Sequence, residues 1–187
     1  MAILDELNWI YFPKTQRMPK ILDGVIDVFK ENFDEIRTDQ KKIKSNDVFK
    51  ILIGSLKDRN FRVEDSKSKI KMPVLYGEKN IPSKYFEVDA FHEEERVVLE
   101  VEAGMALQNM RFLKDIFEAS VMSDVDYLAV SVCNVYEYKS GGKPVSTYPY
   151  EKISIWLETL FSSDRIKLDL RGILLIGYWF WISEECF

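Results

Sequence analysis

Acidic side chains recur at every second position in two neighbouring segments, residues 85–91 and 97–102. This alternation predicts two β-strands, with the acidic side chains of each strand on one face. These four side chains belong to Glu87, Asp89, Glu100 and Glu102. If residues 93–96 form the turn of a hairpin, His92 pairs with Val97, and the same register brings the acids together. Asp89 then lies opposite Glu100, and Glu87 lies opposite Glu102.

Four carboxylates on one face of a hairpin favour a metal site. Like charges directly across a ladder destabilise it. A divalent cation turns the repulsion into coordination, because hard cations such as Mg²⁺ bind carboxylate and carbonyl oxygens. The other interpretation is a hairpin whose charged face contacts solvent, which is common in antiparallel sheets. We favour the metal site because Val97, Val98, Leu99 and Val101 indicate a central strand, which Gly104 and a predicted helix follow at once.

The spacing of these residues resembles a known nuclease signature. Asp89, a short turn and then Glu100-Val101-Glu102 at the end of an apolar strand are similar to the motif of the PD-(D/E)XK nuclease superfamily. Most of that superfamily has Lys at the last position, whereas Glu102 resembles the E-x-E ending of BamHI- and BglII-like type II restriction endonucleases. Val88 stands where the motif has Pro. The order of elements predicted over about residues 45–132 also resembles that core.

The resemblance implies an α/β fold with a restriction-endonuclease-like core, in which helices flank a central mixed β-sheet in the order α-β-β-β-α-β. It implies hydrolysis of DNA phosphodiester bonds, with catalytic Asp89, Glu100 and Glu102. Asp89, Glu100 and the carbonyl of Val101 would hold Mg²⁺, for which Mn²⁺ would substitute. Glu102 would orient or deprotonate the attacking water, or help to hold a second metal ion. The implied partner is double-stranded DNA, cut by a homodimer.

Two other functions fit the same residues. A nuclease-fold protein without catalysis would bind nucleic acid or a protein partner, and its acidic cluster would be incidental. A glycosidase would use two carboxylates as acid and base and would need no metal. In each case we expect Glu87 to be a carboxylate at the rim of the site. We also expect His92, the single histidine, to be a surface residue of the turn and not a base.

Charge is distributed unevenly along the chain, although the formal net charge is −5. Between Arg37 and Lys71 basic residues outnumber acidic ones, which favours a phosphate-contacting surface there as much as an ordinary solvated one. The candidate DNA contacts are Lys41, Lys42, Lys44, Arg59 and Arg62, together with Arg111 in the helix after Glu102. For Arg111 the alternative is an exposed salt bridge with Asp115, four residues further on.

The chain of 187 residues has the length of one domain. We divide residues 1–187 into an N-terminal helical part (about 1–58), a core (about 59–132) and a C-terminal helix and strand (about 150–182). Apolar spacing predicts amphipathic helices over 18–37, 46–58 and 150–161. Strands are expected at 61–63, 70–76, 127–132 and 172–181, and residues 136–149 as a loop or a long hairpin tip.

After Gly104 the pattern predicts a helix of about 18 residues. Its expected core-facing stripe consists of Ala106, Met110, Leu113, Phe117 and Ser120, with Gln108, Arg111, Asp115 and Glu118 on the other side. Together with the strands before and after it, this helix predicts a crossover unit with parallel strands.

Nothing in the sequence predicts export or membrane insertion. Acidic residues stand near the N-terminus where a signal peptide needs basic ones, and the apolar run 172–182 is too short to span a bilayer. Cys133 and Cys186 form no paired motif, so neither a zinc site nor a disulfide framework is expected. We therefore expect a cytoplasmic protein that does not contact a membrane.

Overall fold

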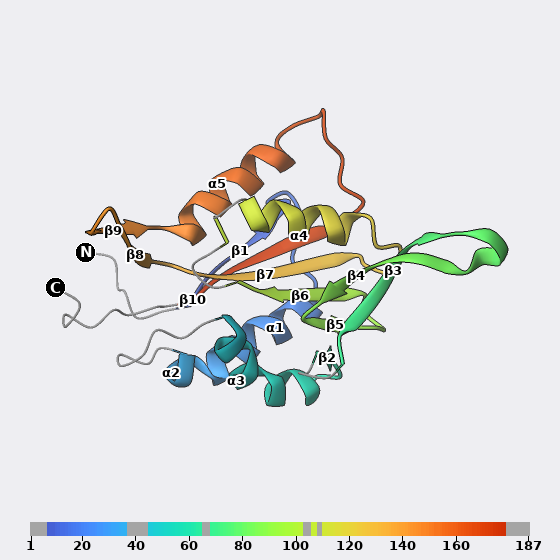
Figure 1. Cartoon of the computed structure of the whole chain (residues 1–187), viewed down its shortest axis with the longest axis horizontal. Helices are drawn as coiled ribbons and strands as arrows, with labels where there is room; N and C mark the ends of the chain where they lie inside the picture. Colours follow the sequence, from blue (N-terminus) through green and yellow to red (C-terminus); the bar gives the residue numbers. More distant parts are fainter. Residues whose placement is uncertain (1–6, 37–44, 65–67, 103–105, 108–109, 179–187) are drawn as a thin grey trace.

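A six-stranded mixed sheet lies at the centre of the molecule (Figure 1). The computed structural model describes residues 7–36, 45–64, 68–102, 106–107 and 110–178. In spatial order the strands are β1 (Asn8–Phe12), β10 (Gly172–Tyr178), β7 (Tyr127–Cys133), β6 (Val97–Val101), β5 (Ala90–His92) and β2 (Arg62–Val63). Strands β10, β7 and β6 are parallel, and β1, β5 and β2 are antiparallel to their neighbours.

Helices cover both faces of this sheet (Figure 1). On one face lie α1 (Lys20–Glu31), α2 (Phe33–Ile36) and α3 (Ser45–Lys57), and on the other lie α4 (Arg111–Ser120) and α5 (Pro149–Phe161). The predicted α/β class, with a central mixed sheet flanked by helices, is thereby confirmed. Alternate residues of β6 enter different cores: Leu99 packs with α1 and α3, and Val98 packs with α4. Glu100, two residues after Val98, therefore lies on the α4 face.

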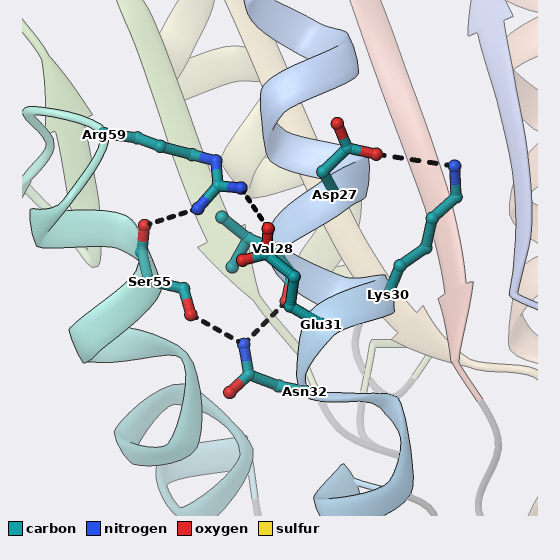
Figure 2. A network of polar contacts seen from close by, with 7 residues as sticks. All are labelled: Asp27, Val28, Lys30, Glu31, Asn32, Ser55 and Arg59. Atoms are coloured by element: carbon teal, nitrogen blue, oxygen red, sulfur yellow. Dashed lines mark hydrogen bonds and ion pairs between the residues drawn. The ribbon is translucent and has the colours of Figure 1, made fainter.

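Side-chain hydrogen bonds join α1 to α3 (Figure 2). Asn32 Nδ2 donates to the Val28 carbonyl at 2.8 Å and to Ser55 Oγ at 2.9 Å. Arg59 donates to the Ser55 carbonyl at 3.1 Å and forms an ion pair with Glu31. Asn32 also marks the end of α1, so the helix predicted over 18–37 is divided there into α1 and the short α2.

The predicted crossover unit is confirmed, because β6, α4 and β7 follow one another and the two strands are parallel. Its helix differs from the expectation. Within the described residues α4 has 10 residues, and Phe117, expected in the core, is 60% exposed. The buried residues are Phe112, Asp115, Ile116, Glu118 and Ala119, so the expectation that Asp115 and Glu118 face solvent is wrong. The buried face is thus rotated by about one position from the predicted stripe of Leu113 and Phe117.

Two hairpins lie outside the central sheet, at opposite ends of the molecule (Figure 1). One joins β3 (Ile70–Tyr76) to β4 (Pro82–Val88), with the short helix η1 (Glu78–Asn80) between them. The other joins β8 (Tyr136–Ser140) to β9 (Lys143–Thr147), where a loop or hairpin tip was predicted. Gly141 and Gly142 form its turn with φ of 59° and 80°, which residues with a Cβ rarely adopt.

Candidate active site

The hairpin that carries the acidic residues has the predicted turn but a shorter ladder. His92 pairs with Val97 and Ala90 pairs with Leu99, as expected. The segment 85–91 is not one strand, however, because β4 ends at Val88 and pairs with β3. Glu87 lies opposite Lys71 and is exposed, so the expected pairing of Glu87 with Glu102 is wrong. The pairing of β4 with β3, which lies outside the predicted hairpin, determines this arrangement, and the alternation of acidic residues does not.

Asp89 lies at the break between β4 and β5, and its backbone and side chain both accept hydrogen bonds. Its carbonyl accepts the N–H of Glu64 at 2.8 Å, and its Oδ2 accepts the N–H of Val101 at 2.8 Å. The side chain therefore binds the main chain of β6 one residue after Glu100. Burial raises the pKa of Asp89 from 3.8 to about 6, and the negative charges of Glu64 and Glu102 add to this rise. The hydrogen bond from Val101 opposes it.

Glu100 and Glu102 stand at the carboxyl end of β6, and both side chains are partly buried. Burial raises the pKa of Glu100 well above its usual value, and Asp89, Asp115 and Glu102 raise it further. Burial also raises the pKa of Glu102, whereas the cations Arg111 and Lys114 lower it. Negative charges on neighbouring acids thus contribute to the raised pKa values of Asp89 and Glu100, which is typical of a functional site.

The main chain around the E-x-E residues is held by neighbouring strands. The N–H of Glu102 donates to the Ser131 carbonyl at 2.8 Å, which extends the parallel ladder with β7. The hydroxyl of Tyr178, from β10, donates to the Glu102 carbonyl at 2.9 Å. The acidic side chains therefore project from a strand that is fixed on the side of β7 and β10.

Asp115 is a member of this group that the sequence analysis assigned to solvent. It is 8% exposed, and its Oδ2 is buried without a hydrogen-bond partner among the described residues. Burial raises its pKa from 3.8 to about 7, with a further contribution from the charge of Glu102. A signal was present in the sequence: Phe112, Ile116 and Ala119 form an apolar stripe that includes Asp115. An acid inside an apolar stripe indicates a buried partner or a functional role.

The cations of α4 balance part of this negative charge. Lys114 donates to Glu118 at 3.1 Å, and this i,i+4 pair replaces the expected salt bridge between Arg111 and Asp115. Arg111 is exposed at the first residue of α4, near enough to Glu102 to lower its pKa. Contact of Arg111 with DNA stays a prediction, and the residue lies near Glu102, where that contact would place it.

Arg59 and Arg62 are the other candidate DNA contacts within the described residues. Lys41, Lys42 and Lys44 fall outside the described residues. Arg59 lies between α1 and α3 in the hydrogen bonds described above (Figure 2). Arg62 is exposed on β2, with a nitrogen 3.9 Å from a carboxylate oxygen of Glu93. Contact with DNA by these residues stays a prediction.

His92 is buried, with 6% exposure, and the expectation of a surface turn residue is wrong. Its Nδ1 accepts the N–H of Glu95 at 3.1 Å, and its ring packs edge-on against Phe61 at 5.1 Å. The imidazole thus satisfies a turn N–H and fills the space beside Phe61, so its position has a structural explanation.

The described side chains alone do not form a complete set of ligands for a cation. Within the described ranges, no group of three or more His, Cys, Asp or Glu side chains lies close enough together to hold a metal ion. The ligands that the resemblance implies are two carboxylates and a main-chain carbonyl. Oxygen donors on one face of a strand suit Mg²⁺, and the buried, unpartnered oxygen of Asp115 is the kind of atom that a cation would satisfy.

No protein-family model matches this chain, and no curated protein matches it. Of the helices described, none is both long and apolar enough to cross a membrane.

The raised pKa of Asp115 predicts a stability that depends on pH. The folded protein binds this proton more tightly than the unfolded chain does, so the stabilisation is complete below about pH 4 and is lost as pH rises to about 7. Relative to Asp115→Asn, the free energy of unfolding of the wild type should fall over this range by on the order of 4 kcal/mol. Urea denaturation with a chelator at a series of pH values measures this difference. Parallel profiles for the two proteins would contradict it.

Proposed function

We propose that this protein is a Mg²⁺-dependent endonuclease that hydrolyses phosphodiester bonds in double-stranded DNA, like a type II restriction endonuclease. The observation that carries the proposal is the set of acidic side chains of Asp89, Glu100, Glu102 and Asp115, whose pKa values are all raised by burial, with added repulsion from neighbouring acids at Asp89, Glu100 and Asp115. Holding several carboxylates in this way opposes their ionisation. Binding a cation or an acid–base role in catalysis accounts for such an arrangement.

The order of elements supports a restriction-endonuclease-like core as part of this proposal. Helix α3 is followed by the strands β2 and β3, the acidic segment ending in β5, the E-x-E strand β6, helix α4 and strand β7. The hairpin of β3 and β4 interrupts this run, and without it the order α3, β2, β5, β6, α4 and β7 agrees with the α-β-β-β-α-β order that the resemblance implies. Both residues of the E-x-E pair come directly at the end of a central strand, where α4 covers the sheet (Figure 1).

Asp89, Glu100 and the carbonyl of Val101 would hold Mg²⁺, and Mn²⁺ would substitute for it. When bound, the ion supplies charge neutralisation at the phosphate and a more acidic water molecule. Glu102 would accept a proton from that water or orient it. Asp115, with a pKa of about 7, would exchange a proton with the group near neutral pH. Arg111 would contact the phosphate from the start of α4.

Cleavage of both strands requires two such sites, so we propose a homodimer as the active form. We also propose that the protein acts in the cytoplasm, as the sequence analysis predicts. Neither proposal changes the roles that we give to the residues of a single site.

Incubation of supercoiled plasmid with the full chain, with Mg²⁺ or with a chelator, tests the proposal. Nicked or linear plasmid in Mg²⁺ alone is the expected result, and discrete fragments would reveal sequence preference. DNA binding without cleavage in either Mg²⁺ or Mn²⁺ would contradict the proposal and favour the nuclease-fold protein without catalysis. Asp89→Asn serves as the control for a contaminating nuclease.

A further inference from the structure

The hairpin of β3 and β4 projects from the body of the protein as an arm, here defined as residues 70–88 (Figure 1). Its two strands pair only with each other in the sheets described. Near the body, Ile70, Met72 and Val88 are buried in the core on the α4 side of the sheet. Phe86 packs edge-on against Phe117 of α4, with ring centroids 6.4 Å apart. The base of the arm is thus fixed, while its outer part has no contact of this kind.

The outer part exposes large side chains that a solvated hairpin does not need. Leu75, Tyr76, Ile81 and Tyr85 are 58%, 47%, 62% and 44% exposed. An open hollow of about 380 Å³ runs along the same strands, lined by Lys71, Ser83, Lys84, Tyr85 and Glu87. Exposed apolar and aromatic groups beside a polar hollow indicate a surface for a partner.

The arm carries three lysines, Lys71, Lys79 and Lys84, against two acids, Glu78 and Glu87, and this balance of +1 favours a polyanion as its partner. No acidic side chain in the described part of the chain forms an ion pair with Lys71, Lys79 or Lys84. Lys84 Nζ instead lies 5.2 Å from the centre of the Phe86 ring. Lysine ammonium groups and tyrosine hydroxyls are typical donors to DNA phosphates.

The arm is also continuous with the acidic residues. Lys84 precedes Asp89 by five residues in an extended segment, which spans about 16 Å. Since each nucleotide of one DNA strand rises about 3.4 Å, this length corresponds to about five nucleotides from the scissile phosphate. A two-stranded ribbon has the width that a groove of B-DNA admits.

We propose that the β3–β4 arm binds the phosphate backbone of a DNA duplex beside the site, through Lys71, Lys84 and Tyr85. The proposal rests on the proposed function for the position of the scissile phosphate. It assigns affinity to the arm and cleavage to the acidic residues. Binding through the arm is therefore separable from catalysis.

Fluorescence anisotropy of the full chain with a labelled DNA duplex, in a chelator and at increasing salt, tests the arm. Lys71→Gln with Lys84→Gln should lower the salt slope by up to about 2, because each phosphate contact contributes about 0.9. Between 50 and 200 mM salt the wild type should then lose roughly tenfold more affinity than this variant. The matched control is Lys143→Gln with Lys152→Gln, which makes the same change of charge on β9 and α5. We expect the control to keep the wild-type slope.

An unchanged slope in the arm variant, or the same decrease in the control, would overturn the proposal. So would loss of a dimer in the arm variant at an unchanged slope, as measured by sedimentation velocity, since the arm would then bind a second copy. The expected slopes without plasmid cleavage by the wild type would support the arm while rejecting the proposed nuclease activity. Cleavage with an arm-independent slope would reject the arm alone.

Discussion

Glu100→Gln should abolish Mg²⁺-dependent cleavage and yield a metal-free protein that is more stable than the wild type at pH 8. Glutamine keeps the size of the side chain and removes a carboxylate that would bind the cation. Because charge stabilisation by a metal is worth several kcal/mol, we expect cleavage to fall about a thousandfold or more. Asp89→Asn should have the same effect on cleavage.

The gain in stability has an electrostatic cause. Burial and the neighbours Asp89, Asp115 and Glu102 disfavour the charged form of Glu100, and the unfolded chain does not have this penalty. Plasmid cleavage and urea denaturation at pH 8 with a chelator measure the two effects. The control is Glu94→Gln, an exposed acid in the turn of the same hairpin, which should change neither. Cleavage at the wild-type rate by Glu100→Gln would refute the site.

Glu102→Lys restores the residue that most of the PD-(D/E)XK superfamily has at this position, and we expect it to lose activity all the same. The structure supplies the reason: Arg111 and Lys114 already act on Glu102, so a lysine there replaces the carboxylate that these two cations face with a third positive charge. We expect cleavage to fall by orders of magnitude, with at least one Mg²⁺ or Mn²⁺ still bound through Asp89 and Glu100.

Isothermal titration calorimetry with Mn²⁺, beside the plasmid assay, separates the roles of Glu102. Glu102→Gln is the matched variant, because it removes the carboxylate without adding a cation. If both variants lose cleavage and keep metal binding, Glu102 acts on the water. Activity at the wild-type level in Glu102→Lys would show that this carboxylate is dispensable. Complete loss of metal binding would show that Asp89 and Glu100 do not form the primary site alone.

Local patterns predicted most elements of the fold. The strand 70–76 and the start of the strand at 172 agree with β3 and β10, and the pairing of His92 with Val97 was correct. Each depends on alternation, on turn residues or on a continuous apolar run, which are properties of neighbouring residues. The parallel pairing of β6 with β7 followed from the helix between them.

The errors concern partners that are distant in the sequence. Residues 85–88 were correctly expected to be extended, but nothing local determines that β4 pairs with β3 instead of β6. Asp115 was placed in solvent because Leu113 and Phe117 form an apolar stripe as good as that of Phe112 and Ile116. Only the proximity to the carboxylates of the neighbouring strand β6 distinguishes the buried face of α4 from the exposed face. Asp89, Glu100 and Glu102 were predicted as one group from sequence, whereas the burial of Asp115 beside them depends on the packing of α4.

The position of β10 between β1 and β7 has a consequence for how the protein is made. The hydroxyl of Tyr11 meets the carbonyl of Arg171, 160 residues later in the chain. At typical rates of synthesis, β1 leaves the ribosome roughly 10–30 s before its partner. Until then the sheet has two unpaired edges, one on β1 and one on β7. Completion of the central sheet therefore waits until β10 is translated, and β1 of the nascent chain has no strand partner until then.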